Sequence, residues 1–211
     1  MKDIENLSKE HFNKQAAIYD ETDTMYYSKM PKVSCRHTAE YLRDFKYESL
    51  LDVGCGTGYL LELLIGQKPA DYHGLDLSDE MLRVAGEKNI PNSTFVLGTA
   101  DKLPYEDGSF DVVTCIQSFH HYPYPDNAMK EALRVLKPDG IYLLSDTGMG
   151  GIGGWIENHL ILPRLKSGDC RVEGMNGIAK MMIRNGFQVI DTKKLTGLVY
   201  TVIGKKSGKR G

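Results

Sequence analysis

The chain has 211 residues, enough for one domain with a sizeable hydrophobic core, so neither a disulfide nor a metal is needed to hold a fold. Hydrophobic residues make up 41% and charged residues 26%, as in ordinary globular proteins, and no apolar run approaches the roughly 18 residues of a membrane-spanning helix. The net charge of −2 provides no broad positive field for a phosphate backbone, so we expect no nucleic-acid partner.

The first 14 residues contain no apolar segment or small-residue cleavage site, so we expect no signal peptide and a cytoplasmic location. The four cysteines are scattered and lack Cys-x-x-Cys or His-x-x-x-His spacing, so we expect neither a disulfide framework nor a metal site. The basic segment KKSGKR, residues 205–210, lies among Gly and Ser. We interpret it as a solvated tail, with an anion-binding role as the alternative.

Residues 8–20 and 32–45 have the patterns of helices and precede five short apolar segments that alternate with further helical patterns. This alternation is typical of βαβ units and a mostly parallel sheet. The predicted strands are residues 49–53, 72–77, 94–97, 110–116 and 141–145. The predicted helices between them are residues 58–66, 79–88 and 127–136, the second with Ser78 as its N-cap.

Residues 148–173 break this pattern: a glycine-rich stretch precedes a broken apolar helix and a loop, so we place the segment outside the sheet. A helix over 177–186 and strands over 187–195 and 198–206 follow. The short Thr-Gly link between these strands predicts an antiparallel hairpin, because a parallel link needs a crossover of about a dozen residues. We therefore predict one α/β domain over residues 1–211, with a doubly wound sheet of seven strands.

The glycine-rich loop from Gly54 to Gly58 lies between the first predicted strand and its helix. Glycine permits positive φ and close approach of a ligand, and the following helix presents free N–H groups. Asp76, 18 residues past Gly58 at the end of the second strand, is placed to bind ribose hydroxyls. Position 59 is tyrosine, so the loop departs from the dinucleotide pattern G-x-G-x-x-G and favours a ligand without phosphates. A tight turn without a ligand is the alternative.

The segments DVGCGTG, GLDLSDEML, ADKLPYEDGSFDVV and EALRVLKPDG resemble, in this order, the class I S-adenosylmethionine-dependent methyltransferases with a methyltransferase type 11 domain. The branch they resemble most includes the ubiquinone/menaquinone-biosynthesis C-methyltransferases. The motifs run from about Leu50 to Ser145, and the terminal hairpin also fits the family. The resemblance implies a Rossmann-like fold, S-adenosyl-L-methionine as cofactor and S-adenosyl-L-homocysteine as product.

The resemblance also implies which residues contact the cofactor. They are Tyr19, Asp52, Gly54, Cys55, Gly56, Gly58, Asp76, Leu77, Met81, Ala100, Asp101, Gln117 and Ser118.

Within this set the family pattern places Asp52 and the glycine loop at the methionine part, Asp76 at the ribose, and Leu77 and Met81 beside the adenine. It also places Ala100 and Asp101 at the edge of the adenine, where the Asp101 carboxylate would accept a hydrogen bond from the adenine amino group.

Gln117 and Ser118 would lie beneath the reactive methyl, and Tyr19, in the N-terminal helices of residues 1–45, would close over the cofactor. Asp101 as a turn cap and Tyr19 as core packing are the alternatives.

The sulfonium methyl group is already electrophilic, so in-line transfer requires alignment of the acceptor and exclusion of water. A general base is needed only if the acceptor must lose a proton. His120 and His121 follow the fourth predicted strand and are the candidate bases, with His121 preferred and a packing role as the alternative.

Residues 148–173 are a candidate substrate lid, with a passive helix or a dimer contact as the alternative. Its apolar side chains suit an aromatic or prenyl-like acceptor. They are Met149, Ile152, Trp155, Ile156 and Leu160.

The predicted function is methyl transfer to a small molecule. A non-catalytic cofactor-binding regulatory module and a nicotinamide-dependent oxidoreductase are the alternatives. The sequence Gln-Ser-Phe-His-His at residues 117–121, in place of Asn/Asp-Pro-Pro-Tyr, argues against DNA and protein-glutamine acceptors.

Overall fold

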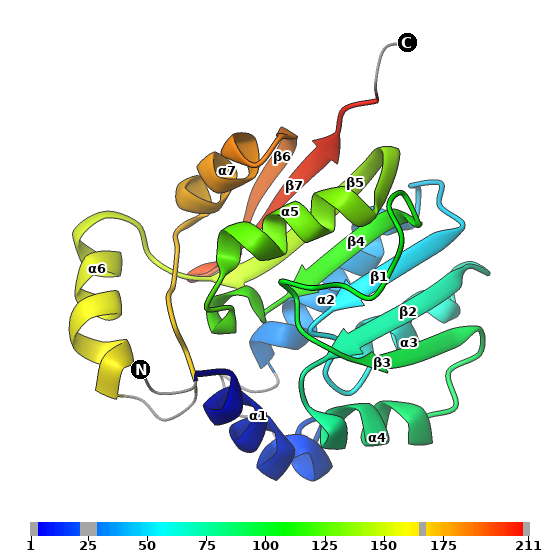
Figure 1. Cartoon of the computed structure of the whole chain (residues 1–211), viewed down its shortest axis with the longest axis horizontal. Coiled ribbons are helices and arrows are strands. Elements are labelled where there is room, and N and C mark those ends of the chain that lie inside the picture. The colour runs from blue at the N-terminus through cyan, green and yellow to red at the C-terminus, as the bar shows by residue number, and fades with distance from the viewer. Residues whose placement is uncertain (1–3, 22–28, 165–167, 209–211) are drawn as a thin grey trace.

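The computed structural model describes residues 4–21, 29–164 and 168–208. One seven-stranded sheet has the strand order β3-β2-β1-β4-β5-β7-β6 (Figure 1). The strands β1 to β5 pair in parallel, whereas β7 runs antiparallel to both β5 and β6. The predicted doubly wound, mostly parallel sheet with an antiparallel C-terminal hairpin is therefore confirmed. The strands are β1 (Ser49–Val53), β2 (Asp71–Asp76), β3 (Ser93–Leu97), β4 (Phe110–Ile116), β5 (Leu136–Thr147), β6 (Phe187–Thr196) and β7 (Val199–Lys206).

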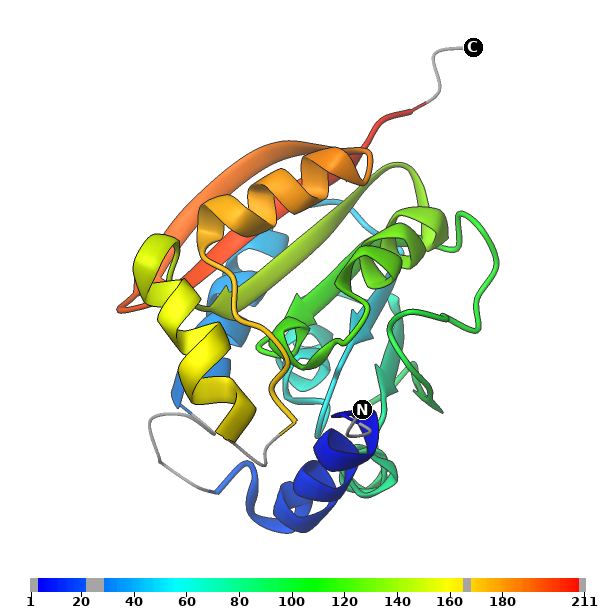
Figure 2. The ribbon, with the colours of Figure 1, turned by 60° about the vertical axis from the view of Figure 1, so that its left-hand side comes forward.

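Helices cover both faces of the sheet (Figures 1 and 2). Neighbouring residues of one strand point to opposite faces: Leu50 packs in the core beneath α2 and α3, and Leu51 packs in the core beneath α5 and α7. The helices are α1 (Ile4–Gln15), α2 (Met30–Leu42), α3 (Tyr59–Ile65), α4 (Asp79–Glu87), α5 (Pro125–Val135), α6 (Gly151–Ile156) and α7 (Met175–Arg184). Each of them, in the ranges described here, is too short or too polar to cross a bilayer.

Helix α1 lies against the first turn of α4, at the carboxyl edge of the parallel strands (Figure 1). Lys9 forms an ion pair with Asp79 at 3.0 Å, and Asn13 donates to the same carboxylate at 3.1 Å. The first turn of α4 is closed by Ser78, whose hydroxyl accepts from the backbone N–H of Met81 at 3.1 Å, as expected for an N-cap. The N-terminal helix is thereby placed over the ends of β1, β2 and β4.

The start of β5 and the basic segment near the C-terminus are among the features that differ from the sequence prediction. Strand β5 begins at Leu136 rather than at residue 141, because Leu136 pairs with Phe110 ahead of a bulge in β4, and the chain turns at Asp139 with φ of +66°. At Lys205 and Lys206, the last residues of β7, the basic segment is not a solvated tail. Lys205 pairs with Asp139 at 2.8 Å, and Lys206 donates to the carbonyl of Leu136 at 2.6 Å; residues 209 and 210 lie outside the described residues.

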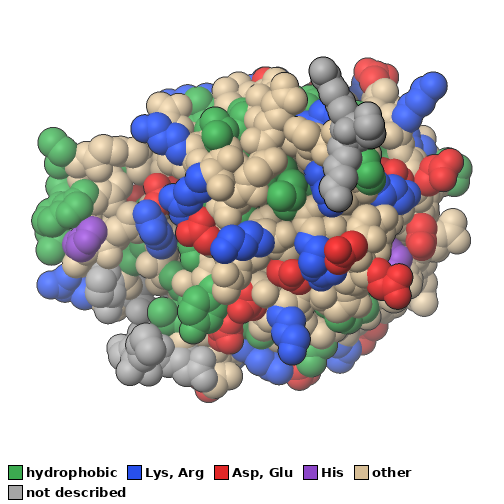
Figure 3. Space-filling model, turned by 45° about the horizontal axis from the view of Figure 1, so that its top comes forward, with side chains coloured by type: hydrophobic (Ala, Val, Ile, Leu, Met, Phe, Trp, Pro, Cys, Tyr) green, Lys and Arg blue, Asp and Glu red, His purple; other side chains and the backbone are tan. Residues whose placement is uncertain are grey.

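The predicted excursion between β5 and α7 lies outside the sheet, and its helix is broken as expected (Figure 1). It begins at Gly151 as α6, continues as the π-helical turn η4 (Glu157–Ile161), and ends as the 3₁₀ turn η5 (Leu162–Arg164). Hydrophobic side chains gather at the left end of the molecule in Figure 3, the side on which α6 lies in Figure 1.

Alanine substitutions at Gly58, which precedes α3, and at Gly86, in α4, are expected to change the free energy of unfolding in opposite directions. Gly58 has φ of +75°, and a Cβ there would lie 3.3 Å from both Ile90 and Phe95. Gly58→Ala is expected to lower the free energy of unfolding by about 1–2 kcal/mol. Gly86→Ala, in the exposed last turn of α4 where a Cβ meets nothing within 4 Å, should raise it by about 0.5–1 kcal/mol. Urea denaturation of both variants checks this, and equal effects would contradict it.

Candidate functional site

A cavity opens at the carboxyl edge of the sheet, beneath α1. It contains about 820 Å³ of empty space, counting the part open to solvent, which is in the range of small-molecule sites. Its lining includes His121 and ten of the thirteen residues for which the sequence predicts a cofactor contact. These ten are Tyr19, Gly54, Gly56, Asp76, Leu77, Met81, Ala100, Asp101, Gln117 and Ser118.

The other three predicted residues lie elsewhere. Asp52 and Cys55 line a smaller hollow on the other side of the glycine loop, which also contains Lys32 of α2. Tyr19, Gly54 and Gly56 line both spaces, so the loop forms the wall between them. Gly58 lines neither space and instead begins α3.

The wall depends on a close contact between the loops that follow β1 and β4. Gly54 has φ of +76°, and a Cβ at this position would lie 1.9 Å from Ser118 Oγ. The Ser118 hydroxyl contacts the hydroxyl of Tyr122 at 2.7 Å, and Tyr122 donates to the carbonyl of Val53 at 3.1 Å. Only a residue without a side chain fits between these groups. Tyr122 therefore holds the two loops together.

Asp76 organises the glycine loop from the neighbouring strand. Its carboxylate accepts the backbone N–H of Gly56 at 2.8 Å and that of Ser78 at 2.9 Å. Burial raises the pKa of this carboxyl group, and the two backbone donors partly offset the increase. One acidic side chain thus connects the loop after β1, the end of β2 and the N-cap of α4.

Asp52 is 2% exposed in the middle of the sheet. It accepts a hydrogen bond from the hydroxyl of Thr114 on β4 at 2.7 Å. Burial raises the pKa of Asp52 to about 7, although this hydrogen bond favours the ionised form. Its carboxyl group therefore changes charge near neutral pH.

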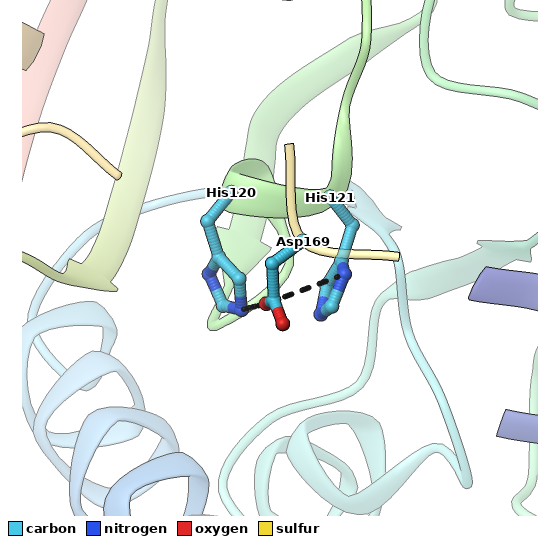
Figure 4. A group of neighbouring side chains, drawn as sticks. All are labelled: His120, His121 and Asp169. Carbon is cyan, nitrogen blue, oxygen red and sulfur yellow. Dashed lines mark ion pairs between the residues drawn. The ribbon is translucent and has the colours of Figure 1, made fainter. Parts of the chain in front are cut away.

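The two candidate bases differ in surroundings, although they are adjacent in the turn η3 (Phe119–His121). His120 Nδ1 donates to Asp146 Oδ1 at 2.7 Å, and its Nε2 lies 3.5 Å from Asp169 Oδ1 (Figure 4). Burial alone would lower the pKa of His120, but the carboxylates of Asp146, Asp169 and Glu157 raise it to about 9. His120 does not line the cavity, and in this state it cannot accept a proton.

His121 lines the cavity and packs edge-on against Phe12 of α1, with ring centres 5.0 Å apart. Burial, together with the charge of His120, lowers its pKa to about 4. The imidazole of His121 is therefore neutral at pH 7 and faces the space in which an acceptor would lie.

Sequence reasoning missed the contribution of α1 to this cavity. Glu5, Ser8, Lys9 and Phe12 all line it, whereas Tyr19 was the one N-terminal residue expected there. The amphipathic pattern of α1 predicts a buried face but not the surface that the face covers. Tyr124, which also lines the cavity, had no distinctive signal.

The candidate lid residues are exposed and do not line the cavity in this structure. Their exposed fractions are 38% for Met149, 81% for Ile152, 56% for Trp155, 40% for Ile156 and 49% for Leu160. Closure of this segment over the cavity stays a prediction.

Comparisons with known proteins find similarity to methyltransferases. A family model described as a methyltransferase domain matches residues 51–144. The uncharacterized methyltransferase YcgJ of Bacillus subtilis is 40% identical over 101 residues, 46% of this chain and 40% of that protein. The demethylmenaquinone methyltransferase of Listeria welshimeri is 32% identical over 150 residues, 68% of this chain and 64% of that protein. The chain thus spans about two fifths of YcgJ and under two thirds of the Listeria enzyme.

A solved structure shows that the fold is shared along nearly the whole chain. One chain of the complex between the Haloferax volcanii Trm112 methyltransferase activator and a methyltransferase superimposes with a TM-score of 0.81. The match covers 97% of this chain and 99% of that one, at 17% identity.

The buried Asp52 predicts a pH dependence of stability. Its folded pKa of about 7 exceeds the ordinary value of 3.8, so between these pH values the folded protein holds a proton that the unfolded chain has lost. The free energy of unfolding contributed by Asp52 therefore falls as the pH rises from about 4 to about 7 and is level above it. Thermal unfolding of the ligand-free chain and of Asp52→Asn, compared at pH 5, 6, 7 and 8, checks this.

The difference in stability between the wild type and Asp52→Asn at each pH isolates the contribution of Asp52. His120 and His121, which titrate in neighbouring pH ranges, contribute equally to both proteins. Parallel pH profiles for the wild type and Asp52→Asn would contradict the assignment.

Proposed function

Because this chain carries a methyltransferase domain over residues 51–144, we propose that it is an S-adenosylmethionine-dependent methyltransferase acting on a small-molecule acceptor by in-line displacement. One observation carries the proposal. The glycine loop, Asp76 and Asp101 lie at the carboxyl ends of three different strands, β1, β2 and β3, and line a single cavity. Such convergence at the carboxyl ends of parallel strands is typical of nucleoside-binding sites.

The shape of the loop fits this cofactor. Gly56 lines both spaces, has φ of +53°, and a Cβ on it would meet nothing within 4 Å, so the backbone there is open to a ligand. We assign the larger cavity to the nucleoside, with Asp76 at the ribose and Leu77, Met81 and Asp101 around the adenine. The smaller hollow beside Asp52 and Cys55 then takes the methionine part.

Gln117, which follows β4, is assigned a place beneath the methyl group. Its φ is +51°, an uncommon value for a residue other than glycine. Its side chain is held from two sides: the amide donates to Ser34 at 3.1 Å, and its oxygen accepts from Thr147 at 2.7 Å. Strained backbone that neighbours hold in place is common at functional sites.

We assign the acceptor to the end of the cavity formed by Phe12, His121, Tyr122 and Tyr124. These rings favour a flat or apolar acceptor. The name of the Listeria relative, a demethylmenaquinone methyltransferase, points to the same chemical class. Closure of residues 148–173 would bring further apolar side chains over this end and exclude water.

Binding of the demethylated cofactor tests the proposal. Calorimetry is expected to detect S-adenosylhomocysteine but not NADH. Asp101→Asn should weaken S-adenosylhomocysteine binding about tenfold, since the amide would present a donor to the adenine amino group. Asp107→Asn is the matched control, because its side chain is 81% exposed and outside the cavity. Binding of NADH alone would refute the proposal.

His121 is the proposed catalytic residue, since it is the member of the histidine pair that lines the cavity. His121→Gln is expected to lower turnover at least tenfold while the affinity for S-adenosylhomocysteine stays unchanged. The rate of S-adenosylhomocysteine formation with an acceptor identified in a screen provides the measurement. His73→Gln, on β2 and outside the cavity, is the control and should keep full turnover. Unchanged turnover in His121→Gln would remove it from the mechanism.

A further inference from the structure

Two adjacent histidines and an aspartate that follows them 48 residues later in the sequence lie together beside the cavity. His120 and His121 come from η3, and Asp169 comes from the segment that follows η5; in Figure 4 the two imidazole rings lie on either side of the carboxylate. The backbone fixes this arrangement, because the N–H groups of Cys170 and Arg171 donate to the carbonyl of His120 at 2.9 and 3.2 Å. Backbone hydrogen bonds therefore hold the three residues close to one another.

The distances suit a metal ion. Asp169 Oδ1 lies 3.5 Å from His120 Nε2 and 3.7 Å from His121 Nδ1, and each of the three residues offers one ligand atom within 4.8 Å of the other two. An ion bound at about 2.0–2.2 Å to nitrogen and oxygen ligands in tetrahedral geometry holds them about 3.3–3.6 Å apart. The two distances from the carboxylate to the imidazoles are already close to this range.

A second carboxylate orients the first of these histidines. His120 Nδ1 donates to Asp146 Oδ1 at 2.7 Å, which leaves Nε2 directed at Asp169. Asp146 is 2% exposed and is itself held by the backbone N–H groups of His120 at 3.1 Å and Thr147 at 2.7 Å. Metal-binding histidines usually donate their other ring N–H to such a carboxylate.

Polar atoms in this region lack the partners that burial requires. Among the described residues, His121 Nδ1 has no hydrogen-bond partner although its side chain is 90% buried, and Glu157 Oε2 on η4 is likewise buried without one. Asp146, Asp169 and Glu157 all interact electrostatically with His120. These carboxylates favour the binding of a cation among them.

We propose that His120 Nε2, His121 Nδ1 and the Asp169 carboxylate bind a divalent first-row transition-metal ion, which displaces the proton that His120 Nε2 otherwise holds. Two imidazole nitrogens and one carboxylate oxygen are a donor set used by Zn²⁺ and Fe²⁺ sites that keep open coordination positions. The sequence predicts no metal because the histidines are adjacent and the third ligand is distant, so no spacing rule applies. Glu157 interacts electrostatically with His120 and Asp169 but is not one of the three ligands.

The site lies next to the acceptor end of the cavity, since His121 lines both. An open position on the ion would hold an oxygen of the acceptor in place for methyl transfer and lower its pKa, so with the ion bound the ion, rather than His121, would activate the acceptor. This use of the ion rests on the proposed function, whereas the binding of the ion does not.

Metal titration of the full chain, freed of any affinity tag and treated with EDTA, tests the site. We expect the wild type to bind one equivalent of Zn²⁺ in competition with a chromogenic chelator, and Co²⁺ to give a visible absorption band. Asp169→Asn should weaken Zn²⁺ binding at least tenfold. Asp71→Asn is the matched control: it removes one carboxylate paired with a histidine, His73 at 3.3 Å, and should bind Zn²⁺ as the wild type does.

His121→Gln provides a second variant, with the same expected loss, in case Asp169→Asn fails to fold. The site is refuted if the folded wild type binds no stoichiometric Zn²⁺, or if Asp169→Asn and Asp71→Asn bind it equally. Calorimetry with S-adenosylhomocysteine on the same samples separates the two proposals. Cofactor binding without Zn²⁺ removes only the metal site, and Zn²⁺ binding without cofactor binding removes only the methyltransferase.

Discussion

The site depends on the missing side chain of Gly54. The hydroxyl of Ser118 occupies the place that a Cβ there would take, and Tyr122 joins both loops through the carbonyl of Val53. β1 and β4 are parallel neighbours, so their connecting loops leave the sheet at the same edge and can approach this closely. The position of Gln117, and that of the histidine turn that follows it, both depend on that contact.

Most of the fold was predictable because its signals are local. Apolar runs of four to seven residues, separated by helical patterns and a short final turn, determine a parallel sheet with a terminal hairpin. Errors occurred where a distant partner outweighs local composition. Leu136 extends β5 because Phe110 offers a pairing partner, and Lys206 is held by the carbonyl of Leu136 although its neighbours in the sequence resemble a loose tail.

The residues of the candidate site likewise fall into those that strand order predicts and those that only long-range contacts place. Glycines and acids that follow consecutive strands lie at the expected edge, because strand order alone places them there. The contribution of Phe12 requires knowing where α1 packs, and the approach of Asp169 to His120 requires the return of a chain that leaves the sheet for some twenty residues. Neither the packing position of α1 nor the return of the chain to His120 can be predicted from a periodic pattern in the sequence. The different protonation of His120 and His121, adjacent in the sequence, arises from these same long-range contacts.

The buried carboxyl groups beside the glycine loop suit the positive charges of the proposed cofactor. Asp52 and Asp76 are buried beside the glycine loop, where burial disfavours their ionised forms. A sulfonium and an ammonium group in the hollow assigned to the methionine part would favour ionisation of Asp52 and gain attraction from it. Methyl transfer removes the sulfonium charge and with it part of that attraction. Asp52 would therefore contribute more to the binding of the methyl donor than to the binding of the product.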